Sequence, residues 1–217
     1  MADSPDEWPR EEYQLAPAEY LAAFGQFSFV YNMLESVMRN IFIHCAPLPN
    51  DFALRLFHNL GNRDRIDLFT AFVSKNEEDN EVLQSLLACA LHYDICTENR
   101  NILMHSTYFS PNIELTLLVK RASNDAGRNI HYDVPLTDLR LIADQTAETF
   151  KFARDLSSFL SAREFIAHLP PTDPITGYPN IGLNPLPEIP HKPRKLTTFQ
   201  PEAARKVSPR QPPSSEE

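Results

Sequence analysis

The chain has 217 residues, of which 42% are hydrophobic, and it carries a formal net charge of −9. This length provides one domain with its own hydrophobic core, and no window approaches the 18 or more apolar residues of a membrane span. Residues 1–168 hold 14 basic and 24 acidic side chains, a balance that disfavours general binding to phosphate backbones. We therefore expect a cytoplasmic protein without a membrane partner, in which any RNA site is local.

Residues 1–17 mix acidic side chains with three prolines and lack the basic and apolar regions of a signal peptide. They are predicted to form a flexible N-terminus. Residues 18–44 then show the strongest helical period of the chain, which predicts a long amphipathic helix. Its apolar stripe is interpreted as core or dimer interface, with members at steps of three and four: Tyr20, Phe24, Phe27, Tyr31, Leu34, Met38 and Ile41.

Shorter helical patterns follow the first helix. One helix is predicted over residues 51–59, and another over residues 62–74 with Asn62 as its cap. A third pattern begins near Asn80 and leads directly into Arg100. It places apolar residues at steps of four on one face, which is predicted to be its core side: Leu83, Leu87, Leu91 and Ile95.

The spacing of the apolar residues changes after the helix that begins near Asn80. Residues 114–121 and 130–134 alternate apolar and polar side chains around a turn cluster, which predicts a β-hairpin insertion near 114–134. Thr137 can cap a last amphipathic helix that ends near residue 167. The sequence therefore predicts an all-α domain over residues 18–168, a helical bundle of about five helices with one small hairpin.

From residue 169 to the end the chain holds 12 of its 19 prolines among few apolar residues. Such a composition does not offset its ordering entropy, so residues 169–217 are predicted to be a disordered Pro-rich tail. Its basic stretch from His191 to Lys195 could dock a partner, although such tails more often act as spacers. Three cysteines without a CxxC pair and five glycines without a phosphate loop predict no metal and no cofactor.

The chain contains three pairs in which His follows Arg after five positions. These are Arg100 to His105, Arg39 to His44 and Arg163 to His168. The second lies on the first helix, where a structural role is favoured, and the third closes the last helix, where cations complement the helix dipole. The first follows the helix that begins near Asn80, with acidic residues on the face of its His. Context therefore favours the pair at Arg100 as functional.

This stretch offers the groups that cleave RNA through the neighbouring 2′-hydroxyl. His105 can take or give a proton, Arg100 can bind two phosphate oxygens, and Asn101 can orient the phosphate or ribose. Asp94 or Glu98 could hold the imidazole tautomer from the same helix face. One His does not easily serve both ends of the reaction, so a two-fold dimer that apposes two motifs is expected. The competing interpretation is a solvated helix end with an ordinary salt bridge to Asp94 or Glu98.

A long first helix, shorter helices, Arg-Asn-x-x-x-His and a final long helix together resemble the HEPN superfamily over roughly residues 18–165. The resemblance assigns Arg100, Asn101 and His105 to the family's signature, and Glu35 resembles the polar residue that many members place opposite it. It implies a homodimeric, metal-independent endoribonuclease that cleaves RNA as a toxin or phage-defence effector, with an antitoxin or other protein partner. The alternative is a non-catalytic HEPN-like module that binds a protein partner.

Overall fold

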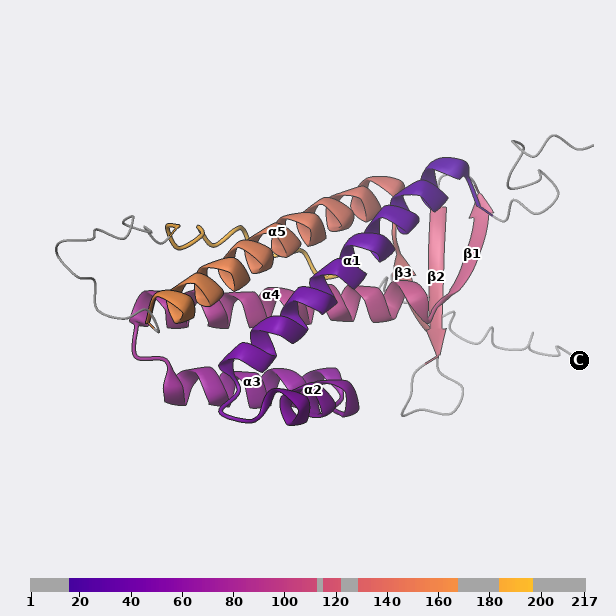
Figure 1. Cartoon of the computed structure of the whole chain (residues 1–217). Helices are drawn as coiled ribbons and strands as arrows, with labels where there is room; N and C mark the ends of the chain where they lie inside the picture. Colours follow the sequence, from indigo (N-terminus) through magenta and orange to yellow (C-terminus); the bar gives the residue numbers. More distant parts are fainter. Residues whose placement is uncertain (1–15, 113–114, 122–128, 168–183, 197–217) are drawn as a thin grey trace, which may run out of the picture.

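The computed structural model describes residues 16–112, 115–121, 129–167 and 184–196, and within them the chain forms five α-helices and three β-strands (Figure 1). No helix in these ranges is long and apolar enough to cross a membrane. The predicted helix positions and the predominantly helical fold with five helices are confirmed. The helices are α1 (Ala18–Cys45), α2 (Asn50–Asn59), α3 (Asn62–Asn76), α4 (Asn80–Met104) and α5 (Leu136–Ala167).

A small antiparallel sheet follows α4 and lies at its C-terminal end (Figure 1). Its strands are β1 (Thr107–Asn112), β2 (Leu115–Arg121) and β3 (Asn129–Asp133), paired in the order β1-β2-β3. The register of β1 against β2 shifts between Phe109 and Asn112. The sequence analysis predicted no strand over residues 107–112, and Pro111, which has no backbone N–H to donate, lies within β1 near the shift in register. The predicted turn cluster lies at residues 124–127, outside the described ranges.

The three long helices form the body of the fold. α1 and α5 pack against each other, and α4 contacts α1, α3 and α5 (Figure 1). α2 and α3 each contact α1 and lie by its C-terminal half, away from the sheet (Figure 1). The apolar stripe of α1 is buried inside this bundle, with Phe27, Leu34 and Ile41 fully enclosed. The stripe therefore belongs to the core of this chain.

α4 buries the face that its apolar residues predicted only in part: Ile95 is buried, and Leu83 and Leu87 are partly buried. Leu91 is 45% exposed, whereas the polar side chains of Thr97 and Asn99 are buried. The reason is that neighbours cover α4 on several sides, so its core contacts are not confined to one stripe. Its start is fixed by Asp79, whose carboxylate accepts hydrogen bonds from the backbone N–H groups of Glu81 and Val82.

The prediction that residues 169–217 form a disordered tail is wrong for residues 184–196. This stretch, the docked segment, runs along α4 and α5 and is hydrogen-bonded to both helices. Its Pro193 is buried, and Leu196 is 6% exposed within the hydrophobic core. The prediction relied on the low number of apolar residues and ignored their spacing. Two buried residues, Pro193 and Leu196, are enough to anchor this segment. The remainder of the predicted tail lies outside the described residues.

His92 on α4 is a titratable group enclosed by the bundle. Its side chain is buried, its ring centre lies 6.4 Å from that of Phe152, and its Nδ1 atom has no hydrogen-bond partner among the described residues. Burial lowers the pKa of His92, and the positive charge of Lys192 in the docked segment lowers it further. His92 is therefore held in its neutral form.

We expect His92 to make the free energy of unfolding depend on pH. The stabilisation is fully present above the pKa of an unfolded histidine, about 6.5, and is lost as the pH falls towards the lower pKa of the folded state. The stability advantage of wild type over His92→Gln should therefore shrink between pH 7.5 and 5, as measured by urea denaturation. A constant difference across this range would contradict the prediction.

Candidate functional site

The Arg-Asn-x-x-x-His motif lies where α4 ends, beside the middle of α1. Arg100 and Asn101 belong to the last turns of α4. The helix ends at Met104, and His105 is the next residue. The guanidinium Nη1 of Arg100 donates to Asn101 Oδ1 at 3.2 Å and to His105 Nε2 at 3.3 Å. His105 is exposed, and Arg100 and Asn101 are partly exposed. The motif therefore brings its cation and its imidazole together at the surface.

The contact between Arg100 and His105 has a chemical consequence. A guanidinium has only donors, so Nε2 of His105 must accept this hydrogen bond. The bond thus requires the neutral tautomer in which Nδ1 carries the proton and Nε2 has a free lone pair. When a phosphate engages Arg100 in place of the imidazole, that lone pair becomes available as a base.

The other two Arg and His pairs do not form such a contact among the described residues. Arg39 donates to Ser36 at 3.1 Å, whereas His44 pairs with Glu164 at 3.3 Å. Arg163 forms a two-point ion pair with Glu77, at 2.6 and 3.1 Å. His168 lies outside the described ranges. Of the two pairs whose members are both described, the one at the end of α4 is therefore joined and the one on α1 is not.

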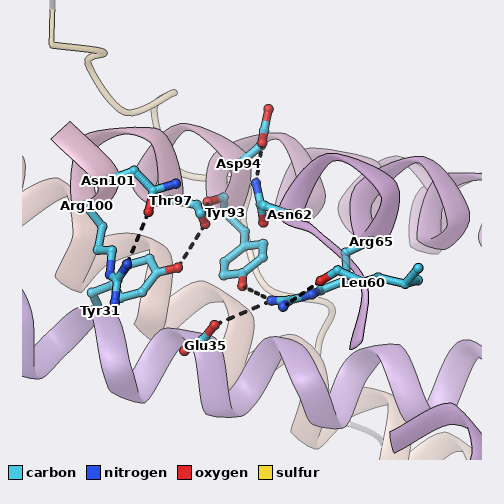
Figure 2. Close-up of polar contacts among 10 residues, drawn as sticks. All are labelled: Tyr31, Glu35, Leu60, Asn62, Arg65, Tyr93, Asp94, Thr97, Arg100 and Asn101. Atoms are coloured by element: carbon cyan, nitrogen blue, oxygen red, sulfur yellow. Dashed lines mark hydrogen bonds and ion pairs between the residues drawn. The ribbon is translucent and has the colours of Figure 1, made fainter. Parts of the chain in front are cut away.

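Tyr31 supports the motif from α1 (Figure 2). The guanidinium carbon of Arg100 lies 5.9 Å from the centre of the Tyr31 ring, within the range of a cation–π interaction. The Thr97 hydroxyl already donates to the carbonyl of Tyr93 at 2.8 Å, so Tyr31 is the donor in its 3.1 Å contact with Thr97. Burial raises the pKa of Tyr31, and Tyr93 adds to this shift, so the phenol stays protonated.

Glu35 pairs with a residue that sequence reasoning did not single out. Arg65 of α3 reaches across to Glu35 Oε1 at 3.4 Å and to the Tyr93 hydroxyl at 3.2 Å (Figure 2). Its second terminal nitrogen donates to the carbonyl of Leu60 at 3.1 Å, and its guanidinium lies 4.3 Å from the ring centre of Phe57. The side chain is only 14% exposed. The partners are about 30 residues apart, so no local pattern indicated this cluster.

Asp94 and Glu98 do not hold the His105 imidazole in the described contacts. Asp94 accepts from Asn62 Nδ2 at 2.7 Å, and Glu98 pairs with Lys195 of the docked segment at 2.5 Å. Asp94 also lies eleven residues before His105, about 16 Å along a helix at about 1.5 Å per residue, which is beyond its reach. Burial raises the pKa of Asp94, and the charge of Glu98 raises it further.

Asn62 also differs from its predicted role as a cap. The residue that precedes α3 is Gly61, and no side chain caps this helix. The Asn62 amide instead joins α3 to α4 through Asp94 (Figure 2). Asn62 and Asp94 are thus structural contacts between two helices.

The arrangement offers a guanidinium, an imidazole and an amide on one exposed helix end. Within the described ranges no cluster of three or more His, Cys, Asp or Glu side chains is placed to hold a metal ion. Comparisons with family models, with curated proteins and with solved structures found no significant match for this chain. The functional interpretation therefore depends on the chemistry of these side chains.

We expect Arg65 and Arg100 to differ sharply in their effect on stability. Arg65→Ala removes a largely buried cation from Glu35, Tyr93 and Leu60, and should lower the free energy of unfolding by about 2–3 kcal/mol. Arg100→Ala removes a partly exposed cation and should cost less than about 1 kcal/mol. Urea denaturation of the two variants beside wild type provides the measurement. Equal losses would show that Arg100 is as structural as Arg65.

Proposed function

We propose that this protein is a metal-independent endoribonuclease of the HEPN type that works as a homodimer. The observation that carries the proposal is the 3.3 Å contact between Arg100 and His105 on an exposed helix end. A cation beside a neutral imidazole matches the needs of RNA cleavage by the neighbouring 2′-hydroxyl. The proposal includes the HEPN-like fold that the family resemblance implies, together with the hairpin insertion near 114–134 that the sequence periodicity predicts.

In the proposed reaction, Arg100 binds the nonbridging oxygens of the scissile phosphate and releases Nε2 of His105. This nitrogen takes the proton of the 2′-hydroxyl, and the 2′-oxygen forms a bond to phosphorus. The bond from phosphorus to the 5′-oxygen then breaks, and a protonated imidazole donates to that oxygen. Arg100 stabilises the negative charge of the phosphorane that forms before this bond breaks. The products are a 2′,3′-cyclic phosphate and a 5′-hydroxyl.

The second imidazole is proposed to come from a second copy of the chain. His105 takes a proton at one end of the reaction, and within the described residues no other His is bonded to Arg100. Two copies related by a two-fold axis would place two Arg100 and two His105 side chains around one phosphate. Each copy would then contribute half of the cleft.

The biological role proposed is that of a toxin or phage-defence effector, with an antitoxin as a protein partner. The acidic balance of residues 1–168 disfavours RNA binding along an extended surface, so the proposal confines RNA to the motif. Arg100 supplies the local positive charge that such engagement requires. The supporting contacts of Glu35, Asp94 and Glu98 act by holding the surrounding helices.

We expect His105→Ala to lower the rate of RNA cleavage by about 10²–10⁴-fold, because it removes the proton-transfer group. Arg100→Ala should lower it by about 10²–10³-fold, because it removes the charge that stabilises the phosphorane. EDTA should leave the rate unchanged. The measurement is cleavage of total RNA and of a defined single strand by purified protein, followed by gel analysis of the product ends.

The matched control is His44→Ala, since His44 follows Arg39 at the same spacing but pairs with Glu164. This variant should cleave at the wild-type rate. Activity that depends on added metal, or full activity in His105→Ala, would reject the ribonuclease proposal. A folded wild-type chain that cleaves no RNA would favour the alternative of a non-catalytic interaction module.

We also expect His105→Ala to inhibit the wild-type protein when the two are mixed. In excess, it would draw wild-type chains into dimers with only one functional imidazole, which lack either the base or the acid. The specific activity of wild type should fall towards that of the variant at saturating RNA, whereas an inert protein should have no effect. Unchanged activity in the mixture would indicate that a single chain carries the complete site.

A further inference from the structure

From Pro187 onward, the docked segment buries every third residue, and Leu186, just before Pro187, is also partly buried. Pro187 and Pro190 are partly buried, and Pro193 and Leu196 are buried. The pairs between them, at residues 188–189, 191–192 and 194–195, are all exposed. This repeat follows the Pro-x-x-Pro-x-x-Pro-x-x-Leu spacing of the sequence. One side of the segment therefore faces the helices along its whole length.

A period of three is typical of the polyproline II conformation. That helix has three residues per turn, and proline fixes the backbone angle that it requires. The chain consequently loses little conformational freedom when such a segment binds. The proline spacing and burial pattern of the segment thus match those of proline-rich peptides that other proteins recognise.

Asn99 of α4 pairs with the backbone of this segment at two points. Its side-chain Nδ2 donates to the carbonyl of Arg194 at 2.8 Å, and its Oδ1 accepts from the N–H of Leu196 at 2.9 Å. Asn99 is 1% exposed, so both its donor and its acceptor are committed inside the protein. Through these two hydrogen bonds Asn99 binds the backbone of the segment and fixes its register on α4.

Other side chains near Asn99 bind the two basic residues of the segment, Arg194 and Lys195. Gln145 of α5 accepts from the backbone N–H of Arg194 at 2.8 Å, and Asp138 accepts from its guanidinium at 3.0 Å. On α4, Glu98 pairs with Lys195 at 2.5 Å. We call Glu98, Asn99, Asp138 and Gln145 the clamp. It combines backbone recognition with charge complementarity to an Arg-Lys pair.

We propose that the clamp, with the adjoining surface of α4 and α5, is a recognition site for a proline-rich peptide that ends in Pro-x-x-Leu with two basic residues between. Residues 187–196 are its tethered occupant. The site recognises the spacing of the apolar residues and the backbone at positions 194 and 196. Its recognition does not depend on the ribonuclease proposal.

The tether explains why the site is occupied by its own chain. Only residues 168–183 separate the end of α5 from the docked segment. A short covalent connection gives an effective local concentration of about the millimolar range. A free peptide that binds with a dissociation constant of about 100 μM would then be outcompeted by about tenfold in the intact chain.

The test uses a fluorescein-labelled synthetic peptide of residues 184–196 and the full-length chain. In the variant Pro193→Asp/Leu196→Asp, the chain's own segment loses both buried anchors and should leave the site open. Fluorescence anisotropy should show the peptide binding this variant at least about tenfold more tightly than wild type. Adding Asn99→Ala to the open variant should weaken binding by about tenfold, because two hydrogen bonds are lost.

The control is a peptide of the same composition but rearranged order, in which proline no longer recurs at every third position. It should not bind the open variant. Equal binding of the two peptides, or no binding to an open variant whose circular dichroism shows that it is folded, would overturn the proposal. A failure of RNA cleavage has no bearing on either outcome.

Hydrogen exchange of the full-length chain gives an independent measurement that needs no open variant. The amide of Leu196 should be protected in wild type and should exchange at least about tenfold faster in Asn99→Ala. Equal exchange in the two proteins would contradict the clamp. Protection that increases with protein concentration would show that the segment comes from a second copy, which would overturn the assignment to the same chain.

Discussion

The enclosure of α4 is the constraint on which the rest of the structure depends. This helix is covered by α1, α3 and α5 and by the docked segment, so polar side chains along it are removed from water. A buried polar group without a partner is costly, and several such groups on α4 have one, with Nδ1 of His92 as an exception among the described residues. Thr97 meets Tyr31, Asn99 meets the docked segment, and Asp94 meets Asn62. Contacts on three sides fix the rotation of the helix about its axis.

The position of the candidate site follows from this fixed rotation. Successive residues of an α-helix point about 100° apart, so the inward direction of Asn99 turns Arg100 to a different side. That side faces Tyr31, whose ring lies beneath the guanidinium. The helix then ends at Met104, and His105 folds back within 3.3 Å of Arg100. Interior contacts thus place two reactive groups at the surface.

Periodicity predicted the helices well because their apolar residues recur locally, and the motif could be located at the end of one of them. It could not predict contacts between residues that are distant in the sequence. Glu35 was singled out by resemblance alone, and its partner Arg65 lies on another helix. The step-of-four leucines suggested one core face for α4, whereas a central helix contacts neighbours on several sides. Asn99 carried no signal, since its partners follow it by about 95 residues.

The docked segment also alters the electrostatic argument drawn from net charge. That argument counted residues 1–168 alone and found them strongly acidic. In the folded chain Lys195 neutralises Glu98, which lies only two residues before Arg100, and Arg194 neutralises Asp138. An unpaired carboxylate at Glu98 would repel a phosphate that approaches Arg100. Because the segment pairs with Glu98, the net charge of residues 1–168 is a poor guide to the charge at the end of α4.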